Sequence, residues 1–293
     1  MKPLTVPGRL EEAARRSRNP DFGQWFADLP QTVSEVAETW QLNVADPFQP
    51  GGQCSWSAPA MTRGGERLVL KIGWRHTEAL QEADALRVWG GDGAVGLLAD
   101  AQHGSSQVLL LEQCVPGVPM SWTTGEPDQD LVVAHLFKRL SRAPSAGHPF
   151  RPLTDVCDAW ADEFARRLPY SQVEIDPGIA RAGIALLREL PRTAPETVLL
   201  HGDLHAENIL SSHREPWLAI DPKPCVGDPA FDALQHLGNS LSRISTDPVS
   251  LINRVAGLLD LDAGRLQLWS FARCVQETPN WPRLYDVALV IAP

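Results

Sequence analysis

The spacing of apolar residues changes along this chain of 293 residues. From about Glu11 to Leu42 apolar side chains recur at helical intervals among many charges, which predicts one or two leading helices. From about Asn43 to Glu112 the apolar runs shorten to strand length and paired glycines separate them, which predicts a small, mostly antiparallel sheet. One helix, from Thr77 as its N-cap to about Trp89, interrupts that sheet.

The second half of the chain has mainly helical patterns. Turn-forming residues are dense from Val115 to Asp130, so we place a lobe boundary there. The helical segments that follow are about 130–142, 154–168, 177–190, 229–243, 248–259 and 263–277, and a strand-rich island at 198–221 interrupts them. We expect an α+β fold of two lobes. Residues 1–112 form the leading helices and the β-rich lobe, 113–117 a hinge, and 118–293 the larger helical lobe, with a crevice between the lobes.

Composition narrows the class of protein. Apolar residues make up 43% and charged residues 21%, which is typical of a globular chain. A net charge of −10 without a basic stripe argues against nucleic acid as a partner and leaves room for a cationic ligand. Five scattered cysteines without a C-x-x-C pair indicate buried thiols in a reducing compartment. With no signal peptide and no long apolar run, we expect a soluble, cytoplasmic protein without a membrane partner.

The most informative segment runs from Val198 to Asp232, where polar residues lie between apolar, strand-like runs. A polar turn, SSHREP, separates two such runs and predicts a hairpin. If Ser211 pairs with Leu218, Asn208 lies opposite Asp221, with their Cα atoms about 4.5 to 5.5 Å apart. An amide oxygen and a carboxylate so placed can share one Mg²⁺ ion.

Asp203 precedes Asn208 by five residues, which is the spacing of the catalytic aspartate and metal-binding asparagine in the kinase loop H-R-D-L-x-x-x-N. Here the loop reads HGDLHAEN. Together with WLAIDPKPCVGDPAFD further on, it resembles the aminoglycoside phosphotransferases, which share the protein-kinase-like fold. Within that family the two motifs are most similar to the streptomycin 6-phosphotransferase and hydroxyurea phosphotransferase branch.

The resemblance implies a role for each matching residue. Asp203 would be the catalytic residue that orients the acceptor hydroxyl or takes its proton, and Asn208 and Asp221 would hold Mg²⁺ on the phosphates of ATP. His201 would support the loop from behind, whereas His205 could face the site or fill the core beneath it. Asp228 and Asp232 also lie in the second motif, and either could brace the loop or line the acceptor pocket. Asp228 precedes a proline, so capping of the next helix explains it equally well.

The same resemblance predicts a phosphate-binding lysine on a strand of the first lobe. Lys71 lies in the run ERLVLKI, in a chain that has only four lysines. Alternation places Leu70 on one face of the strand and Lys71 on the other. By resemblance Lys71 contacts the α- and β-phosphates of ATP and pairs with a glutamate of the following helix. Glu82 is the preferred partner because it lies on the sheet-facing stripe of that helix, and Glu78 is the alternative.

Two further nucleotide contacts follow from position in the family fold. Gly51, Gly52 and Ser55 lie in a turn between the first two strands, where backbone N–H groups could cover phosphates, although an ordinary hairpin turn is nearly as good an explanation. Glu112 and Cys114 follow the last strand, in the hinge whose backbone binds adenine in this fold. In an insert of about 85 residues between the hinge and the loop, and in the last helix, carboxylates such as Glu277 could line the acceptor site or simply face solvent.

These features together predict an ATP-dependent enzyme that phosphorylates a hydroxyl of a small, streptomycin-like acceptor and so confers antibiotic resistance. The kinase D-F-G is replaced here by D-P-K-P and no A-P-E segment follows, which argues against a protein substrate. Other small metabolites or sugars stay open as acceptors. Two rival hypotheses are a metal-dependent hydrolase with His201, Asp203, His205 and Asp221 as ligands, and a binding module without activity. The sequence predicts no oligomeric state.

Overall fold

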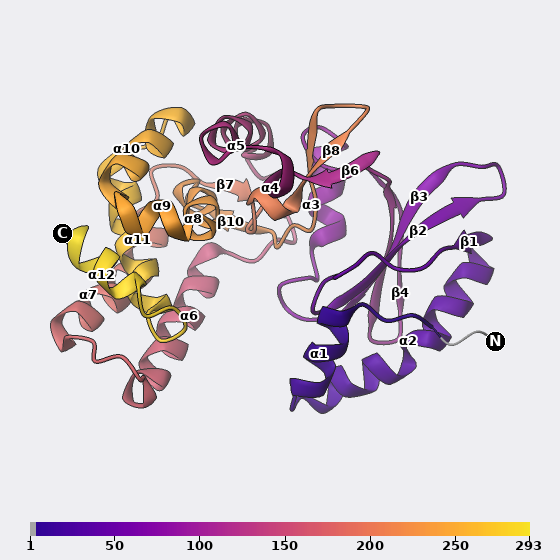
Figure 1. The fold of residues 1–293 in the computed structure, drawn as a ribbon, viewed down its shortest axis with the longest axis horizontal. Coiled ribbons are helices and arrows are strands. Elements are labelled where there is room, and N and C mark those ends of the chain that lie inside the picture. Colours follow the sequence, from indigo (N-terminus) through magenta and orange to yellow (C-terminus); the bar gives the residue numbers. More distant parts are fainter. Residues whose placement is uncertain (1–3) are drawn as a thin grey trace. The chain divides into compact units, whose positions relative to one another are not determined.

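The computed structural model describes residues 4–293 and divides the chain into two compact units, Met1–Gly117 and Val118–Pro293. The first unit holds the leading helices and the large sheet, and the second holds most of the helices (Figure 1). The α+β architecture with an antiparallel sheet ahead of a mainly helical region is therefore confirmed. Within the described residues, no helix is both long and apolar enough to cross a membrane.

Unit 1 is a five-stranded antiparallel sheet with three helices. Its elements are α1 (Gly8–Arg16), α2 (Pro20–Thr39), β1 (Leu42–Val44), β2 (Ser55–Thr62), β3 (Arg67–Trp74), α3 (Glu82–Trp89), β4 (Leu97–His103) and β5 (Ser106–Glu112). The strands lie in the order β1-β2-β3-β5-β4, so β3 is at the centre. A central strand has both backbone edges hydrogen-bonded, which makes β3 a rigid support for its side chains.

The leading helices cover one face of this sheet. Trp25 of α2 is fully buried, packs in one core cluster with Leu70 and Ile72 of β3, and donates its indole N–H to Ser106 Oγ at 3.0 Å. Because side chains alternate along a strand, Lys71 between these two residues points to the opposite face. The helical pattern at the start of the chain thus supplies one side of the core and leaves the other face of β3 for Lys71.

Helix α3 begins later than the sequence predicts. The chain before it forms four-residue turns, in which Ala79 N–H donates to His76 O at 2.9 Å and Glu82 N–H donates to Ala79 O at 3.3 Å. Thr77 is therefore not the N-cap, and Glu82 is the first residue of the helix. A left-handed Gly90, with φ of 58°, ends the helix in the usual way for a glycine after the last turn.

Unit 2 surrounds a small β-rich centre with helices. Its helices are α4 (Met120–Thr123), α5 (Glu126–Leu140), α6 (Leu153–Arg167), α7 (Pro177–Glu189), α8 (Ala230–Asn239), α9 (Leu241–Thr246), α10 (Pro248–Leu259), α11 (Ala263–Glu277) and α12 (Leu284–Val290), with short 3₁₀ turns η1 (Leu168–Tyr170), η2 (Leu190–Thr193) and η3 (Ala206–Asn208). Its strands are β7 (Val198–Leu200), β8 (Ile209–Ser212), β9 (Trp217–Ala219) and β10 (Cys225–Gly227), and β6 (Pro116–Pro119) crosses the boundary between the units. The strand island thus extends beyond Asp221, and α12 was not predicted.

A buried carboxylate ties the helices of unit 2 together. Asp130 of α5 is 1% exposed and accepts hydrogen bonds from both terminal nitrogens of Arg243, each at 2.8 Å, and from Arg254 Nε at 2.8 Å. His236 Nε2 of α8 lies 2.7 Å from the same carboxylate. Burial alone would raise the pKa of Asp130, but hydrogen bonds from Arg243 and His236 hold that pKa well below its usual range. One side chain therefore links α5 with α8, α9 and α10.

Substitution of Asp130 tests how much this carboxylate contributes to the stability of the fold. Asp130→Asn keeps the shape of the side chain but removes the buried charge that Arg243 and Arg254 both contact, so we expect a loss of about 3 kcal/mol in the free energy of unfolding. Asp128→Asn in the first turn of the same helix, where the side chain is exposed, is the matched control and costs less than about 1 kcal/mol. Urea denaturation of the two variants measures both values, and equal losses would contradict the role of Asp130.

Candidate active site

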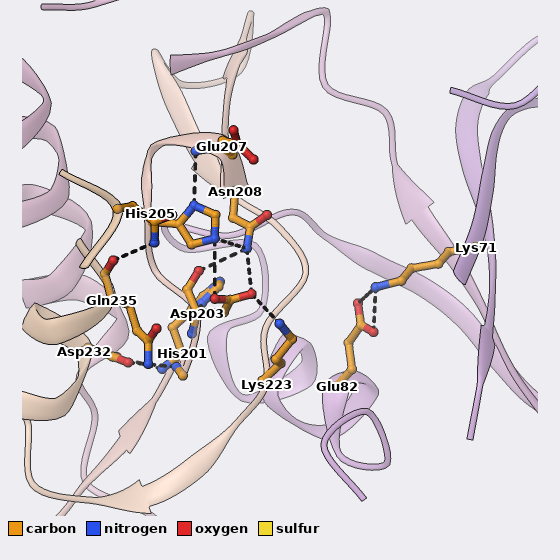
Figure 2. Close-up of polar contacts among 12 residues, drawn as sticks. Lys71, Glu82, His201, Asp203, His205, Glu207, Asn208, Lys223, Asp232 and Gln235 are labelled. Carbon is orange, nitrogen blue, oxygen red and sulfur yellow. Dashed lines mark hydrogen bonds and ion pairs between the residues drawn. The ribbon is translucent and has the colours of Figure 1, made fainter. Parts of the chain in front are cut away.

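In unit 1, Lys71 forms a buried ion pair with Glu82. Its Nζ lies 2.7 Å from Glu82 Oε1 and 2.8 Å from Oε2, and the two side chains are only 10% and 5% exposed (Figure 2). Lys71 lies opposite Ser57 on β2 and Leu109 on β5, so the ladder fixes its position. The sequence left Glu82 and Glu78 open as partners, and the structure pairs Lys71 with Glu82. A fixed buried ammonium is suited to hold phosphate oxygens.

In unit 2, a buried carboxylate fixes the HGDLHAEN loop. Asp232 of α8 accepts the backbone N–H of His201 at 2.8 Å and that of Gly202 at 2.7 Å (Figure 2). Burial raises the pKa of Asp232 to about 7, against the two amide donors that favour its charged form. Asp232 therefore braces the loop, which was one of the two roles considered, and does not face a ligand.

The loop also packs tightly against the segment after β9. Gly202 has φ of 78°, and an added Cβ would lie 2.1 Å from Lys223 O. Lys223 N–H donates to His201 O at 2.8 Å, which joins the two segments through their backbones. Only glycine combines this left-handed conformation with so close an approach. His201 is fully buried, and burial lowers its pKa to about 4, so its ring is neutral and supports the loop from behind.

Three side chains hold the Asp203 carboxylate. Lys223 Nζ donates to its Oδ2 at 2.6 Å, Asn208 Nδ2 donates to the same oxygen at 3.1 Å, and His205 Nε2 lies 3.4 Å from Oδ1 (Figure 2). His205 Nδ1 accepts the amide N–H of Glu207 at 3.3 Å, which places the ring proton on Nε2, toward Asp203. The His205 ring is thus directed at Asp203 and does not fill the core beneath the loop.

These contacts set the charge state of Asp203. Burial would raise its pKa, but the hydrogen bond from His205 and the positive charge of Lys223 hold that pKa well below its usual range. The group is therefore a carboxylate over the whole physiological pH range. Such a carboxylate is a weak proton acceptor and a good hydrogen-bond acceptor, so it is better suited to orient a hydroxyl than to deprotonate it outright.

Lys223 is the residue of this cluster that the sequence reading did not assign. Two signals were present: lysine is scarce in the chain, and this one stands two residues after Asp221, in the D-P-K-P segment that departs from the kinase pattern. Neither signal shows a contact with Asp203, because the two residues are 20 positions apart and meet only through the fold.

The predicted register of the β8–β9 hairpin is wrong by one residue. Ser211 lies opposite Trp217, not Leu218, and Ile220 N–H donates to Asn208 O at 2.9 Å, so Asn208 faces Ile220 and not Asp221. The reason is the turn: Ser212 N–H donates to Pro216 O at 3.4 Å, which leaves a loop of three residues where the prediction assumed four. Asp221 instead follows the strand in a left-handed conformation, with φ of 57°, which aspartate tolerates better than most residues.

Asn208 and Asp221 fit the needs of a magnesium ion. Asn208 uses its amide nitrogen toward Asp203, at 3.0 Å from O and 3.1 Å from Oδ2, so its amide oxygen is turned to other partners. Asp221 lies close enough to His201 for its charge to act on that ring's pKa. Mg²⁺ is usually held by one or two protein oxygens together with phosphates and water, and an amide and a carboxylate suit it. The residues present therefore fit the ion, and their role as ligands stays a prediction.

The predicted phosphate turn and hinge have local structural explanations. An added Cβ at Gly51, whose φ is 73°, would lie 2.4 Å from Pro7 Cβ, so this glycine lets the turn pack on the N-terminal segment. A Cβ on Gly52 would lie 3.0 Å from Ser55 Oγ. In the hinge, Glu112 Oε2 accepts the N–H of Gly96 at 3.0 Å, and Cys114 is buried. Nucleotide binding by these residues stays a prediction.

The acidic residues considered for the acceptor have other partners. Asp228 is 1% exposed and accepts from Ala230 N–H, Arg265 Nε and the Trp269 indole at 3.0, 2.6 and 2.6 Å, so it is an interior anchor of α8 and α11 and not part of an acceptor wall. Glu277 of α11 pairs with Arg273 at 3.0 Å. Three carboxylates of α6 also pair with arginines: Asp158 with Arg192, Asp162 with Arg188, and Glu163 with Arg166.

The hydrolase hypothesis requires a cluster of metal ligands. Between residues 4 and 293 no three histidine, cysteine, aspartate or glutamate side chains are grouped so that they could hold a metal ion. His201 Nδ1 accepts the amide N–H of Asp203 at 3.3 Å inside the core, which is a structural use of the ring. The proposed set of His201, Asp203, His205 and Asp221 is therefore not assembled as a metal centre.

Comparison with known proteins agrees with this geometry. The model of a family described as aminoglycoside/hydroxyurea antibiotic resistance kinase matches residues 40–283. The chain belongs to this family. The antibiotic resistance kinase family consists of ATP-binding phosphotransferases, so the chain is a kinase, and the family assignment made from the loop motif is confirmed.

Full-length relatives carry two different activities. The chain is 33% identical over 296 residues to a streptomycin 6-kinase of Streptomyces griseus, covering 99% of this chain and 94% of the relative. It is 34% identical over 283 residues to a hydroxyurea phosphotransferase of Kitasatospora aureofaciens, covering 93% of this chain and 79% of the relative. The family's kinase chemistry is thus shared by relatives that act on unlike acceptors.

Solved structures support the fold. An aminoglycoside phosphotransferase from Streptomyces rimosus, in complex with ADP and streptomycin, matches with a TM-score of 0.55 and 17% identity over 86% of this chain and 98% of that one. A choline kinase from Streptococcus pneumoniae matches with a TM-score of 0.56 and 15% identity over 90% of this chain and 95% of that one. Both matches show that this chain shares the backbone fold of these structures.

The buried histidine behind the loop predicts a pH effect on stability. The unfolded chain binds a proton at His201 below about pH 6.5, whereas the folded chain resists protonation until about pH 4. His201 therefore stabilises the fold fully above 6.5, and this contribution of about 3 kcal/mol is lost as pH falls to about 4. His201→Gln lacks the titration, so we expect the stability difference between the two chains to shrink or reverse on acidification.

Urea denaturation at several pH values between about 8 and about 4 measures this difference. Asp232 titrates in the opposite sense in the same range, because its raised pKa favours the folded chain at low pH, but it is present in both chains and cancels in the comparison. A stability difference that is constant with pH would contradict the neutral state of His201.

Proposed function

We propose that this kinase transfers the γ-phosphoryl group of ATP to a hydroxyl of a streptomycin-like aminoglycoside. The observation that carries the proposal is the Asp203 carboxylate, which three side chains and a braced loop hold in one place and one charge state. The relatives that match over nearly the whole chain supply the acceptor class, since two of them are streptomycin 6-kinases.

In the proposed reaction the bond between the γ-phosphorus and its bridging oxygen to the β-phosphate breaks, and a bond from that phosphorus to the acceptor oxygen forms. Asp203 accepts a hydrogen bond from the acceptor hydroxyl and aims its oxygen at the phosphorus. The hydroxyl proton leaves late, through Asp203, as the new ester bond forms, and the products are ADP and a phosphate monoester. Because the transition state is loose, positioning matters more than basicity.

The remaining predicted residues take supporting roles in this proposal. Lys71, held by Glu82, binds the α- and β-phosphates. Asn208 and Asp221 hold Mg²⁺, which when bound neutralises charge on the phosphates. Gly51, Gly52 and Ser55 would cover the phosphates, and the backbone at Glu112 and Cys114 would receive the adenine ring.

A second acceptor class is favoured by the charges of the helical insert. Three carboxylates of α6 that could attract a polycation pair with arginines, as in Asp158–Arg192 and Asp162–Arg188. With these charges paired, the helix attracts a polycation only weakly, which suits a small uncharged hydroxyl compound such as hydroxyurea. The hydroxyurea phosphotransferase among the relatives is consistent with this alternative.

Substitution of the central residues tests the chemistry. We expect Asp203→Ala and Lys71→Ala each to lower kcat for phosphotransfer by about 100-fold or more, because each removes a group that acts on the reacting atoms or the phosphates. Lys138→Ala, which removes an exposed lysine at the end of α5, is the control and keeps normal turnover. Release of ADP is the measurement, with thermal unfolding to show that each variant is folded, and near-normal turnover by Asp203→Ala would refute its role.

An acceptor panel tests the substrate. With ATP and Mg²⁺, we expect ADP release to rise with streptomycin and to stay near background with aminoglycosides of other ring systems. The product, analysed by mass spectrometry, gains one phosphoryl group. Turnover with hydroxyurea and none with streptomycin would replace the first acceptor by the second, whereas no turnover with either would refute both.

A further inference from the structure

Lys223 places a positive charge on the proposed catalytic carboxylate. It belongs to the D-P-K-P segment between β9 and β10, and its Nζ lies 2.6 Å from Asp203 Oδ2 (Figure 2). The side chain of Lys223 is 39% exposed, while that of Asp203 is 17% exposed. Lys223 is therefore the more solvent-exposed partner of this ion pair.

The backbone fixes where this side chain starts. Proline on both sides, at 222 and 224, restricts the torsions of the segment. The N–H of Lys223 donates to His201 O at 2.8 Å, and its carbonyl lies against Gly202, where even one added Cβ would come within 2.1 Å. The α-carbon of Lys223 is thus anchored on the catalytic loop, and only the flexible side chain can change its position.

Simple distances bring the ammonium within reach of the transferring group. An acceptor oxygen hydrogen-bonded to Asp203 lies about 2.6 to 3.2 Å from it. The phosphorus under attack is about 3 to 3.5 Å from that oxygen. A lysine already in contact with the Asp203 carboxylate can turn to the phosphoryl oxygens by rotating its side-chain bonds, without any movement of the backbone.

Charge gives a reason for a cation at this place. The carboxylate of Asp203 and the phosphoryl group are both negative and must lie on either side of one hydroxyl oxygen, and without a cation they repel each other. In a loose transition state the three phosphoryl oxygens carry the charge, so a cation beside them lowers the barrier.

We propose that Lys223 is a catalytic residue that contacts the γ-phosphoryl group during transfer, and that its pairing with Asp203 is its position before the substrates bind. This inference rests on the proposed kinase reaction. Lys223 forms no covalent bond and stays protonated: it donates hydrogen bonds to the phosphoryl oxygens while the phosphorus moves from ADP to the acceptor. In a purely structural role, the ion pair of Lys223 with Asp203 would only hold the D-P-K-P segment against the HGDLHAEN loop.

Three variants separate these roles. Lys223→Ala removes the charge, Lys223→Arg keeps it with a different shape, and Lys138→Ala is the matched lysine control away from the loop. We expect Lys223→Ala to lower kcat about 100-fold, with KM for ATP and the affinity for Mg·ADP within about threefold of wild type. Lys223→Arg should recover a large part of the lost kcat, and all three variants should unfold at nearly the wild-type temperature, since a half-exposed ion pair adds little stability.

A binding measurement that needs no turnover completes the test. Aluminium fluoride with Mg·ADP mimics the planar transferring phosphoryl group, so the wild-type chain should bind ADP more tightly when the fluoride is present. Calorimetry should show this gain reduced about tenfold or more in Lys223→Ala and retained in Lys138→Ala. ATP hydrolysis by water is followed in parallel, so the comparison does not depend on the acceptor.

The outcomes separate the role of Lys223 from the proposed kinase reaction. Normal kcat and an unchanged fluoride effect in Lys223→Ala would overturn the role of Lys223 and leave the kinase proposal intact. Inactive Lys223→Ala and Lys223→Arg with equal, large losses of unfolding temperature would show a structural tie and also overturn it. A wild-type chain that neither binds Mg·ADP nor turns over ATP would refute the proposed function, and this inference with it.

Discussion

The candidate site depends on one buried carboxylate. Asp232 accepts the two consecutive amides of His201 and Gly202, which otherwise would be unsatisfied donors inside the protein. This contact fixes the turn from which Asp203 extends, and Gly202 is then the residue type that lets the D-P-K-P segment lie against the loop. Asp203 thus extends from a fixed backbone, and the Lys223 segment is joined to the same loop through the hydrogen bond from Lys223 N–H to His201 O.

His201 and Asp203 of the loop differ in their charge states. His201, behind the loop, is neutral because it is buried, and Asp203, in front, is charged because His205 and Lys223 stabilise the anion. In this loop the charge therefore lies on Asp203 and not on the buried His201 ring. In unit 1, by contrast, the charged side chain of Lys71 is buried. Both carboxylate oxygens of Glu82 accept hydrogen bonds from its ammonium group. In each unit the geometry, and not the intrinsic basicity of the group, determines what the side chain can do.

Family membership shows the phosphotransferase chemistry and does not fix the acceptor. The streptomycin and hydroxyurea kinases among the relatives differ greatly in acceptor size and charge. In this chain three carboxylates of α6 pair with arginines, Arg273 lies over the Trp160 ring at 3.9 Å, and Glu277 pairs with that arginine. These acidic side chains are therefore engaged in contacts within the protein.

The sequence by itself determined the fold class, most of the elements and the HGDLHAEN loop, because these depend on local periods of apolar residues and on one motif of fixed spacing. Lys71 was found through the resemblance to the family fold, and strand alternation gave only the face on which it lies. The tertiary structure alone decided the register of β8–β9, where a three-residue loop shifted Asn208 from Asp221 to Ile220. It also decided that Asp228 is an interior anchor, that Asp232 holds the loop, and that Lys223 meets Asp203. These contacts join residues 20 to 41 positions apart, and such pairings are set by packing and burial that no local pattern encodes.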